Sequence, residues 1–382
     1  MRNKRLDVLR CIAVLLVIAR HEYPQTRVGN AGWVGVDLFF VLSGFLISGL
    51  LFAEYKSHRS IDWKRFFIRR GLKLYPAFYV FLFATFLVQF GSHQIGGLSS
   101  YLGEVFYVQN YGPYIWNHTW SLAVEEHFYI LLPAFLLLLV RFSSDRANPF
   151  RMVAPAFLFV AIACLVSRIA TVMVIPAGQL RSWLVYRPIY VSTHNRMDSL
   201  FFGVLLGYLY HFWPRKLAAA FSTKRKSLAL SLLAAALLSC CLIVPIESPF
   251  MLTMGFTLLY VGFGIVLMLC LHVRGVLPKI LERPTAQAGA GLAYTGMYSY
   301  SIYLWHGAVL VWLPNALRRI TWFETAISGN KQLRIALSVS YVVISITLGI
   351  LMSRLVEYPV LHLRDRLFPF AQSPISAQQS PP

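Results

Sequence analysis

The feature that most constrains this chain is a series of apolar blocks, each about twenty residues long. An α-helix needs about 20 apolar residues to cross the hydrocarbon core of a bilayer. Such blocks occur near residues 6–23, 33–53, 74–91, 121–140, 152–174, 197–213, 227–246, 251–272, 291–313 and 334–356. These blocks are too long for transmembrane strands, and they lack the alternation of apolar and polar residues that such strands show. We therefore predict an all-α, polytopic membrane bundle of about ten helices.

The charged residues support the same class and orient the bundle. They make up 13% of the chain, about half the share in a soluble globular protein, which excludes a soluble enzyme and a disordered chain. The formal charge is +20. With the N-terminus inside, 23 Lys and Arg residues fall in inner loops and 7 in outer loops, as the positive-inside rule requires. We predict a multi-pass protein of the inner membrane with both termini cytoplasmic and no nucleic-acid partner.

The chain divides into one large domain and a short tail. Residues 1–366 are predicted to form the membrane-embedded domain, so any chemistry must take place there. Residues 367–382 are rich in Pro, Ser and Gln, and this composition predicts a disordered cytoplasmic tail. The five cysteines all lie in apolar blocks, which favours buried side chains over disulfides or a metal site. We expect no metal.

Ionisable residues inside the first two spans are hypotheses for a functional site, because a bilayer makes them costly. Arg10 and His21 are 11 residues apart, which places them within about 20° of each other around a helix. An arginine reaching the headgroups and an interfacial histidine would explain them equally well. In the second span, Asp37 shares a face with Gly44 and Ser48. The small residues favour close helix packing, whereas the carboxylate needs a partner.

The densest basic run, from Lys64 to Lys73, follows the second span. Arg65, Arg69 and Lys73 recur at i, i+4 spacing, which would align three cations on one helix face. Such a face favours a bound anion. The alternative is an ordinary inner loop.

Acids and a histidine lie towards the outer side. Glu125 and Glu126 open the fourth span, where they are either dipole-stabilising or catalytic. Arg196 and Asp198 open the sixth span and are candidates for a structural ion pair. His306 lies in the outer half of the ninth span. An anionic ligand bound at the inner side and proton transfer near the outer face would explain this separation.

The outer segment 91–120 has no Lys or Arg but many aromatic residues, among them Tyr114, Trp116 and Trp120. An aromatic belt at the membrane interface accounts for them. A platform for the apolar face of a sugar or polyketide is the second interpretation.

Six motifs occur in chain order between about residues 5 and 366. They are Arg10 and His21 separated by ten residues; the run from Gly35 to Ile47; Arg69-Arg70 with Lys73 and Pro76; the run from Trp120 to Tyr129; Arg196 and Asp198 with Gly203; and the run from Ser299 to His306. Together they resemble the bacterial membrane-bound acyltransferase-3 family, whose members O-acylate surface sugars and some secondary metabolites.

The resemblance implies an activity. The bundle would take an acyl group, commonly acetyl, from cytoplasmic acyl-CoA and deliver it to a carbohydrate hydroxyl at the outer face. Arg10 and His21 match the family's Arg-x10-His motif, with His21 the essential residue. Arg70 and Lys73 match an Arg-x-x-Arg motif, in which Lys73 replaces the second arginine and loses its bidentate fork.

A histidine suits this chemistry, since a sugar hydroxyl needs a base whose pKa lies near neutrality. His21 is expected to be that base or to carry the acyl group itself, with Glu125 or Glu126 orienting its ring. The predicted catalytic residues are His21, Glu125, Glu126, Asp37 and His306. The predicted residues for acetyl-CoA or another acyl-CoA are Arg10, Arg65, Arg69, Arg70 and Lys73. The predicted substrate-binding residues are Trp120, Arg196, Asp198, Tyr300 and Tyr303.

Other functions stay open at this point. The acceptor could be an exopolysaccharide, O-antigen or other envelope glycan, or a secondary metabolite such as a macrolide. Membrane lipids and a separate periplasmic or glycan-assembly protein are expected partners. A transporter of glycan intermediates would also have ten spans, although no inverted repeat is visible. A membrane scaffold subunit would hold the same polar residues for structural reasons alone.

Overall fold

The computed structural model describes residues 3–93, 95–176, 179–273, 282–317 and 330–369, which form helices and connections without a strand. The α-helices are α1 (Lys4–Glu22), α2 (Arg27–Ala31), α3 (Gly35–His58), α4 (Trp63–Gly91), α5 (Leu98–Val105), α6 (Trp120–Phe142), α7 (Val153–Val174), α8 (Trp183–Val191), α9 (Thr193–Phe212), α10 (Pro214–Ala219), α11 (Lys224–Ile243), α12 (Phe256–His272), α13 (Glu282–Met297), α14 (Ser299–Leu317), α16 (Lys331–Met352) and α17 (Tyr358–Leu367). The 3-10 turns are η1 (Gly32–Val34), η2 (Asn117–Thr119) and η3 (Gln179–Arg181), and the π-helical turns are η4 (Met251–Gly255) and η6 (Ser353–Glu357). The all-α prediction is confirmed.

A helix covers each of the ten predicted spans, but the helices are not equivalent. Seven helical segments of the described chain are long and apolar enough to cross a membrane. The first span (α1) and the sixth (α9) are not among them. The ninth is divided, because a turn at Tyr298 separates α13 from α14. The basic run 64–73 belongs to the first turns of α4 rather than to a loop. Nearly all of the predicted tail, from residue 370 on, lies outside the described residues.

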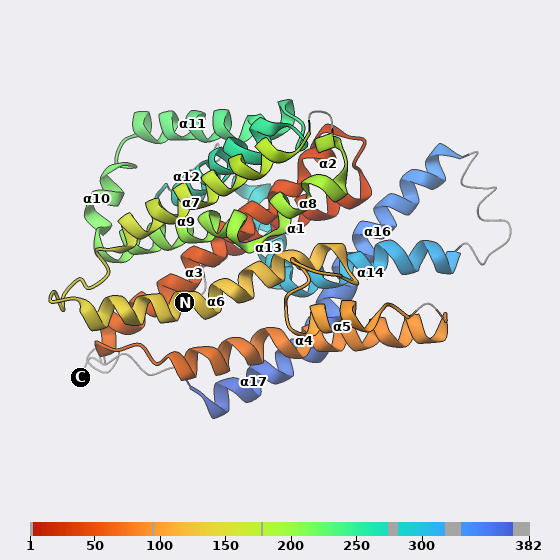
Figure 1. The fold of residues 1–382 in the computed structure, drawn as a ribbon, viewed down its shortest axis with the longest axis horizontal. Coiled ribbons are helices and arrows are strands. Elements are labelled where there is room, and N and C mark those ends of the chain that lie inside the picture. Colours follow the sequence, from red (N-terminus) through yellow and green to blue (C-terminus); the bar gives the residue numbers. More distant parts are fainter. Residues whose placement is uncertain (1–2, 94, 177–178, 274–281, 318–329, 370–382) are drawn as a thin grey trace.

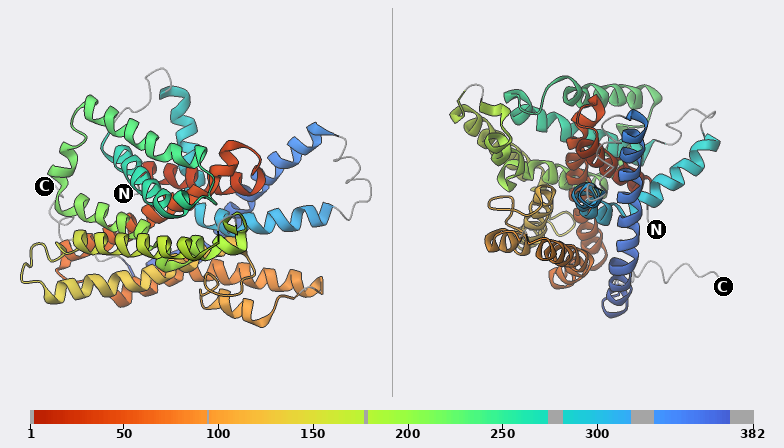
Figure 2. Two further views of the ribbon diagram at one scale, coloured as in Figure 1. Left: turned by 45° about the horizontal axis from the view of Figure 1, so that its top comes forward. Right: turned by 90° about the vertical axis from the view of Figure 1, so that its right-hand side faces the viewer.

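The long helices run roughly side by side, and α3 lies within the bundle against α9 (Figures 1 and 2). Two glycines allow this close contact. A Cβ at Gly44 would lie 2.0 Å from the Leu200 carbonyl oxygen, and one at Gly203 would lie 2.4 Å from that of Val41. Small residues at a helix interface let the backbones approach in this way. The stripe that begins at Asp37 is therefore a packing face.

Two fully buried ion pairs hold the same region. Arg196 of α9 contacts Asp37 of α3, with Nη2 and Oδ1 2.6 Å apart, and Arg168 of α7 contacts Asp198 of α9, with Nη2 and Oδ2 2.9 Å apart. The expected pair between Arg196 and Asp198 is thus replaced by two pairs that join three helices. Residues two positions apart lie on different sides of a helix, so each reaches a different neighbour.

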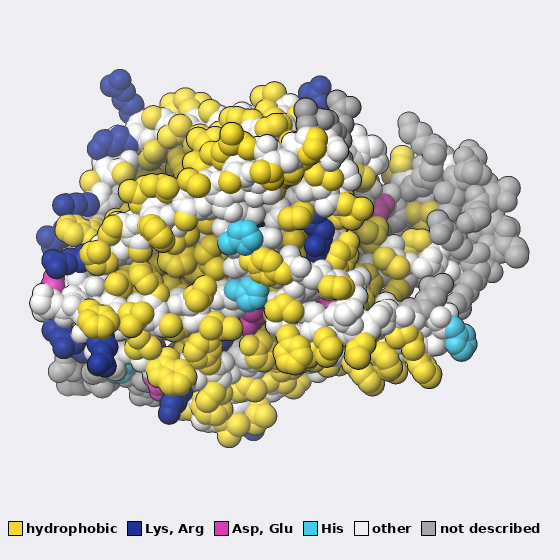
Figure 3. All heavy atoms as spheres, in the orientation of Figure 1, with side chains coloured by type: hydrophobic (Ala, Val, Ile, Leu, Met, Phe, Trp, Pro, Cys, Tyr) yellow, Lys and Arg dark blue, Asp and Glu magenta, His cyan; other side chains and the backbone are white. Residues whose placement is uncertain are grey.

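Exposed cations gather at one end of the bundle, where α3 ends and α4 begins (Figure 3). They include Lys56, Arg59, Lys64, Arg141, Arg146, Arg151, Arg215 and Lys216. These residues come from the connections that the charge count assigns to the cytoplasm. Towards the opposite end, α1 ends and α3 begins.

Candidate active site

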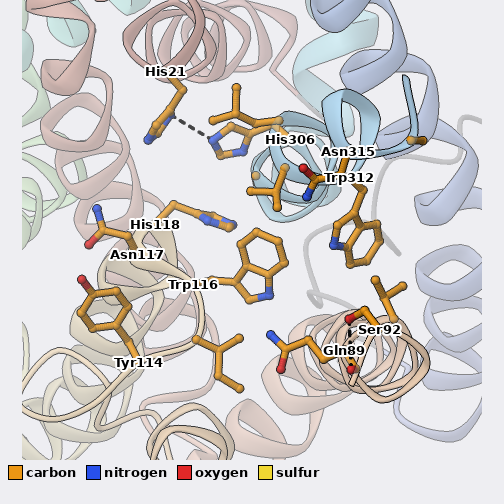
Figure 4. A pocket seen from close by; sticks show the side chains of 16 residues that line it. His21, Gln89, Ser92, Tyr114, Trp116, Asn117, His118, His306, Trp312 and Asn315 are labelled. Carbon is orange, nitrogen blue, oxygen red and sulfur yellow. Dashed lines mark hydrogen bonds between the residues drawn. The ribbon is translucent and has the colours of Figure 1, made fainter. Parts of the chain in front are cut away.

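Two histidines from distant parts of the chain meet between α1 and α14. The His21 Nδ1 and His306 Nε2 atoms lie 3.2 Å apart, and the ring centroids 5.0 Å (Figure 4). His306 is fully buried, whereas His21 is half-buried. The structure therefore brings together two residues that the sequence analysis singled out 285 positions apart.

Backbone carbonyls define the tautomers of this pair. The Nδ1 atom of His306 faces the Tyr303 carbonyl oxygen, and the Nδ1 atom of His21 lies 3.0 Å from that of Val17. A carbonyl can only accept, so both Nδ1 atoms carry the proton. His306 then accepts at Nε2 from the shared Nδ1–H of His21. This arrangement leaves the Nε2 lone pair of His21 available as a base or nucleophile.

A third histidine, His118 of η2, packs against the pair. Its ring centroid lies 4.9 Å from that of His306, and its Nε2–H donates to the Leu304 carbonyl oxygen at 3.1 Å. Gly307 makes room for it, because a Cβ there would lie 2.4 Å from the His118 Cε1 atom. His118 was not among the residues predicted from the sequence, because it lies in the aromatic outer segment. The described residues contain no group of His, Cys, Asp or Glu that could hold a metal ion.

A buried acid holds the loop that carries His118. One carboxylate oxygen of Glu104 accepts from the Ile115 and Trp116 backbone N–H groups, at 3.1 Å each, and from the Thr119 hydroxyl at 3.0 Å. Burial raises the pKa of the Glu104 carboxyl to about 7, against the effect of these donors. The Trp116 indole N–H also donates to the Thr85 hydroxyl of α4. Glu104 thereby holds Trp116 and Thr119, the two residues that flank Asn117 and His118 in the chain.

Three cavities follow one another in this region, and the histidines line the outer and middle ones. The outer cavity, of about 630 Å³, is lined by His21, His118 and His306 at one end and extends past Trp116 to Gln89 and Trp312 (Figure 4). A middle cavity of about 290 Å³ shares His21, Asn117 and His118 with it. The inner cavity, of about 100 Å³, shares only Val36 and Tyr303 with the middle one. His21 lies at the junction of the outer and middle cavities.

The inner cavity holds charged groups. Arg10, Arg70 and Lys73 line it together with Glu125 and Glu357. The Arg70 guanidinium lies over the Tyr129 ring at 3.8 Å and 3.9 Å from a Glu125 carboxylate oxygen. Glu125 also accepts from the Ser43 hydroxyl at 2.8 Å and the Tyr129 hydroxyl at 2.6 Å. The lining of this cavity thus contains three basic and two acidic side chains.

The two predicted glutamates do not orient His21. Glu125 is held by the contacts just described, and Glu126 accepts from the Tyr75 hydroxyl at 3.1 Å. The hydrogen bonds of the His21 ring come from His306 and the Val17 carbonyl instead. Consecutive residues of α6 point to different sides of the helix, so the two acids occupy separate environments.

Other predicted residues lie in structural contacts. Asp37, Arg196 and Asp198 belong to the buried ion pairs and line none of the three cavities. Arg69 pairs with Asp365 of α17 at 2.9 Å and donates to the Phe368 carbonyl oxygen. Neither Arg69 nor Arg65 lines the inner cavity. The three predicted cations therefore do not act as one face. Helix α17 packs against α4 and pairs with Arg69, and only Lys73 lines the inner cavity.

The predicted aromatic residues line the inner and middle cavities. Tyr303 lines the inner and middle cavities, and its hydroxyl donates to the His118 carbonyl oxygen and contacts the Ser121 hydroxyl, both at 2.6 Å. Tyr300 lines the inner cavity and donates to the Leu74 carbonyl oxygen. Trp120 lines the middle cavity, packed between Phe40 and Tyr190.

Comparison with known proteins identifies the family of this chain. The model of the acyltransferase domain family matches residues 3–354. The chain is 30% identical over 331 residues to YrhL of Bacillus subtilis (strain 168), covering 80% of this chain and 48% of that one. It is 30% identical over 331 residues to the peptidoglycan O-acetyltransferase OatA of Listeria monocytogenes (80% and 49%), and 28% identical over 328 residues to the O-acetyltransferase OatA of Staphylococcus aureus (strain NCTC 8325 / PS 47; 81% and 50%).

The chain spans about half the length of these curated relatives. No solved structure matches it. The family match covers the three histidines, both buried ion pairs and the described lining of the inner cavity except Glu357. This chain, with its apolar helices, belongs to the acyltransferase domain family.

Proposed function

We propose that the protein is an integral-membrane O-acyltransferase that moves an acyl group, in the simplest case acetyl, from cytoplasmic acyl-CoA to a hydroxyl of a cell-envelope glycan. The observation that carries the proposal is the position of His21 where two cavities meet, with its Nδ1 atom 3.0 Å from the Val17 carbonyl oxygen and 3.2 Å from the His306 Nε2 atom. The O-acetyltransferase names of the Listeria and Staphylococcus relatives support the reaction and a glycan acceptor.

The inner cavity suits the donor. Coenzyme A carries several phosphate charges, and Arg10, Arg70 and Lys73 offer cations from α1 and α4. Arginine and lysine are the side chains that bind phosphate in proteins. The end of the bundle that carries the exposed cations would face the cytoplasm. The donor's thioester arm would then reach His21 past Val36 and Tyr303, the two residues that the inner and middle cavities share.

The chemistry follows from the tautomer. His21 Nε2 takes the proton of the acceptor hydroxyl while that oxygen forms a bond to the thioester carbonyl carbon. The carbon–sulfur bond then breaks, and the leaving thiolate takes the proton from His21. The Val17 carbonyl and His306 Nε2 both accept from His21 Nδ1–H and stabilise the imidazolium between these steps.

Acyl transfer in membrane vesicles tests the function. With labelled acetyl-CoA supplied on the cytoplasmic side and a glycan on the other, the His21→Ala variant should lose about 10²- to 10⁴-fold in rate, the usual worth of a general base. His127→Ala is a matched control, because His127 lines none of the three cavities. Transfer by His21→Ala at the normal rate would overturn the proposal.

The same assay without an acceptor separates the two routes. If His21 carries the acyl group, label should appear on the purified protein and disappear when the glycan is added. Direct transfer leaves the protein unlabelled.

A further inference from the structure

The outer cavity differs from the inner one in charge. Among the sixteen residues of the described chain that line it there is no Lys, Arg, Asp or Glu. Arg187 lies beside its wall, where the guanidinium covers one face of the Tyr114 ring at 4.4 Å and donates to the Gln109 carbonyl oxygen. Arg187 does not line the cavity.

Aromatic and amide side chains take the place of charges. The lining contains the rings of Tyr114, Trp116 and Trp312 and the amides of Gln89, Asn117 and Asn315. Trp116 is buried and Trp312 half-buried, with centroids 6.0 Å apart at 67°. The Trp116 position is fixed by its hydrogen bonds to Thr85 and Glu104, so Trp312 offers the more accessible ring.

This combination favours one class of ligand. Aromatic rings pack against the C–H faces of a sugar ring, and amides form hydrogen bonds with its hydroxyl groups. A carboxylate, phosphate or ammonium group in this cavity would lose water without meeting an opposite charge among the described lining residues, which is unfavourable. The volume of about 630 Å³ lies in the range of small-molecule sites.

We propose that the outer cavity binds an uncharged sugar unit of the acceptor, with Trp312 as its stacking surface. The inference rests on the proposed function and adds the chemical class of the acceptor unit. The three histidines close one end of the cavity, while Trp312, Asn315, Gln89 and Ser92 line the other (Figure 4). A sugar lying along the cavity would present one hydroxyl to His21 and the rest of its chain to the far end.

Direct binding tests this assignment without an acyl donor. The full chain in detergent would be titrated by calorimetry with three trisaccharides: neutral N-acetylglucosamine trimer, its cationic de-N-acetylated form, and anionic trigalacturonate. We expect the neutral trimer to bind at least tenfold more tightly than either charged one. Equal binding of a charged trimer, or no binding of the neutral trimer at millimolar concentration, would overturn the proposal.

Variants locate the site. Trp312→Ala should weaken binding of the neutral trimer about tenfold or more, and Asn315→Ala, an exposed position, serves if the first variant does not fold. Trp183→Ala is the matched control, because Trp183 lines only the middle cavity. Weakening by Trp183→Ala alone would place the sugar in the middle cavity and overturn the assignment.

The outcome is separable from the test of the proposed function. Sugar binding is measured without an acyl donor, so its result does not depend on whether His21 acts as a base. If His21→Ala keeps acyl transfer, the proposed function fails whatever the sugar binding shows. If charged trimers bind as well as the neutral one, the sugar assignment fails while the acyltransferase activity stands.

Discussion

Two sets of buried polar groups lie in this apolar bundle, and they are built differently. The ion pairs Asp37–Arg196 and Arg168–Asp198 have side chains with no exposure and border none of the three cavities. The histidines contact backbone carbonyls and one another; all three border the outer cavity, and His21 and His118 also border the middle one. The ion pairs join helices inside the bundle, whereas the histidines border cavities, which is why we propose chemistry for the histidines alone.

The largest expected effect lies at the ion pairs. Asp37→Ala leaves the Arg196 guanidinium buried without its partner, which costs about 3–5 kcal/mol of folding free energy. We expect little folded protein in fluorescence-detected size-exclusion chromatography of detergent extracts. Asp37→Leu combined with Arg196→Met removes both charges and should restore the folded peak. Normal folding of Asp37→Ala would contradict the structural role of this pair.

The opposite pattern is expected at His306. His306→Leu keeps an apolar side chain of similar size but removes the acceptor at Nε2, so the His21 ring is no longer oriented. We expect acyl transfer to fall about 10²-fold, the cost of a displaced catalytic group, while the melting temperature changes little. If the variant melts at a much lower temperature but its folded molecules transfer acyl groups at the normal rate, His306 has a structural role only.

The sequence predicted the helices well but predicted the contacts between these polar groups poorly. The apolar blocks were enough for the helices, because a bilayer fixes the length and polarity of a span. The pairing of Asp37 with Arg196 depends on the α3–α9 contact at Gly44 and Gly203, and such contacts between distant segments leave no local pattern. His118 stands outside the apolar blocks, where a histidine is not unusual. For His21 and His306, the sequence predicted only that both lie towards the outer side of the membrane, and not that their side chains are in contact.

A smaller effect is expected where the third histidine packs. Gly307→Ala places a methyl group 2.4 Å from the His118 Cε1 atom, so the ring must move. We expect a stability cost of about 1–3 kcal/mol and a loss of about tenfold in transfer rate, measured by thermal melting and the vesicle assay. Gly291→Ala is the control, since its Cβ would meet open space.

A second substitution separates crowding from chemistry at this position. Gly307→Ala with His118→Ala removes the clash and should recover most of the melting temperature. If the double variant also recovers the full rate, His118 belongs with the packing groups. A rate that stays low places it with His21 and His306.

The smallest expected effect concerns Glu104. This buried acid belongs neither to the ion pairs nor to the histidines, and it accepts hydrogen bonds from two backbone N–H groups and one hydroxyl. Its pKa is raised from 4.5 to about 7 in the folded protein, so the folded state keeps a proton that the unfolded state has lost between these pH values. Stability must therefore fall as pH rises from about 4.5 to about 7 and change no further above it. We expect the melting temperature to drop about 2–4 °C across this range. Glu104→Gln should remove the slope, whereas Glu54→Gln, at a half-exposed position, should retain it. A slope that survives in Glu104→Gln would show that the carboxylate is ionised in place and that its three donors outweigh its burial.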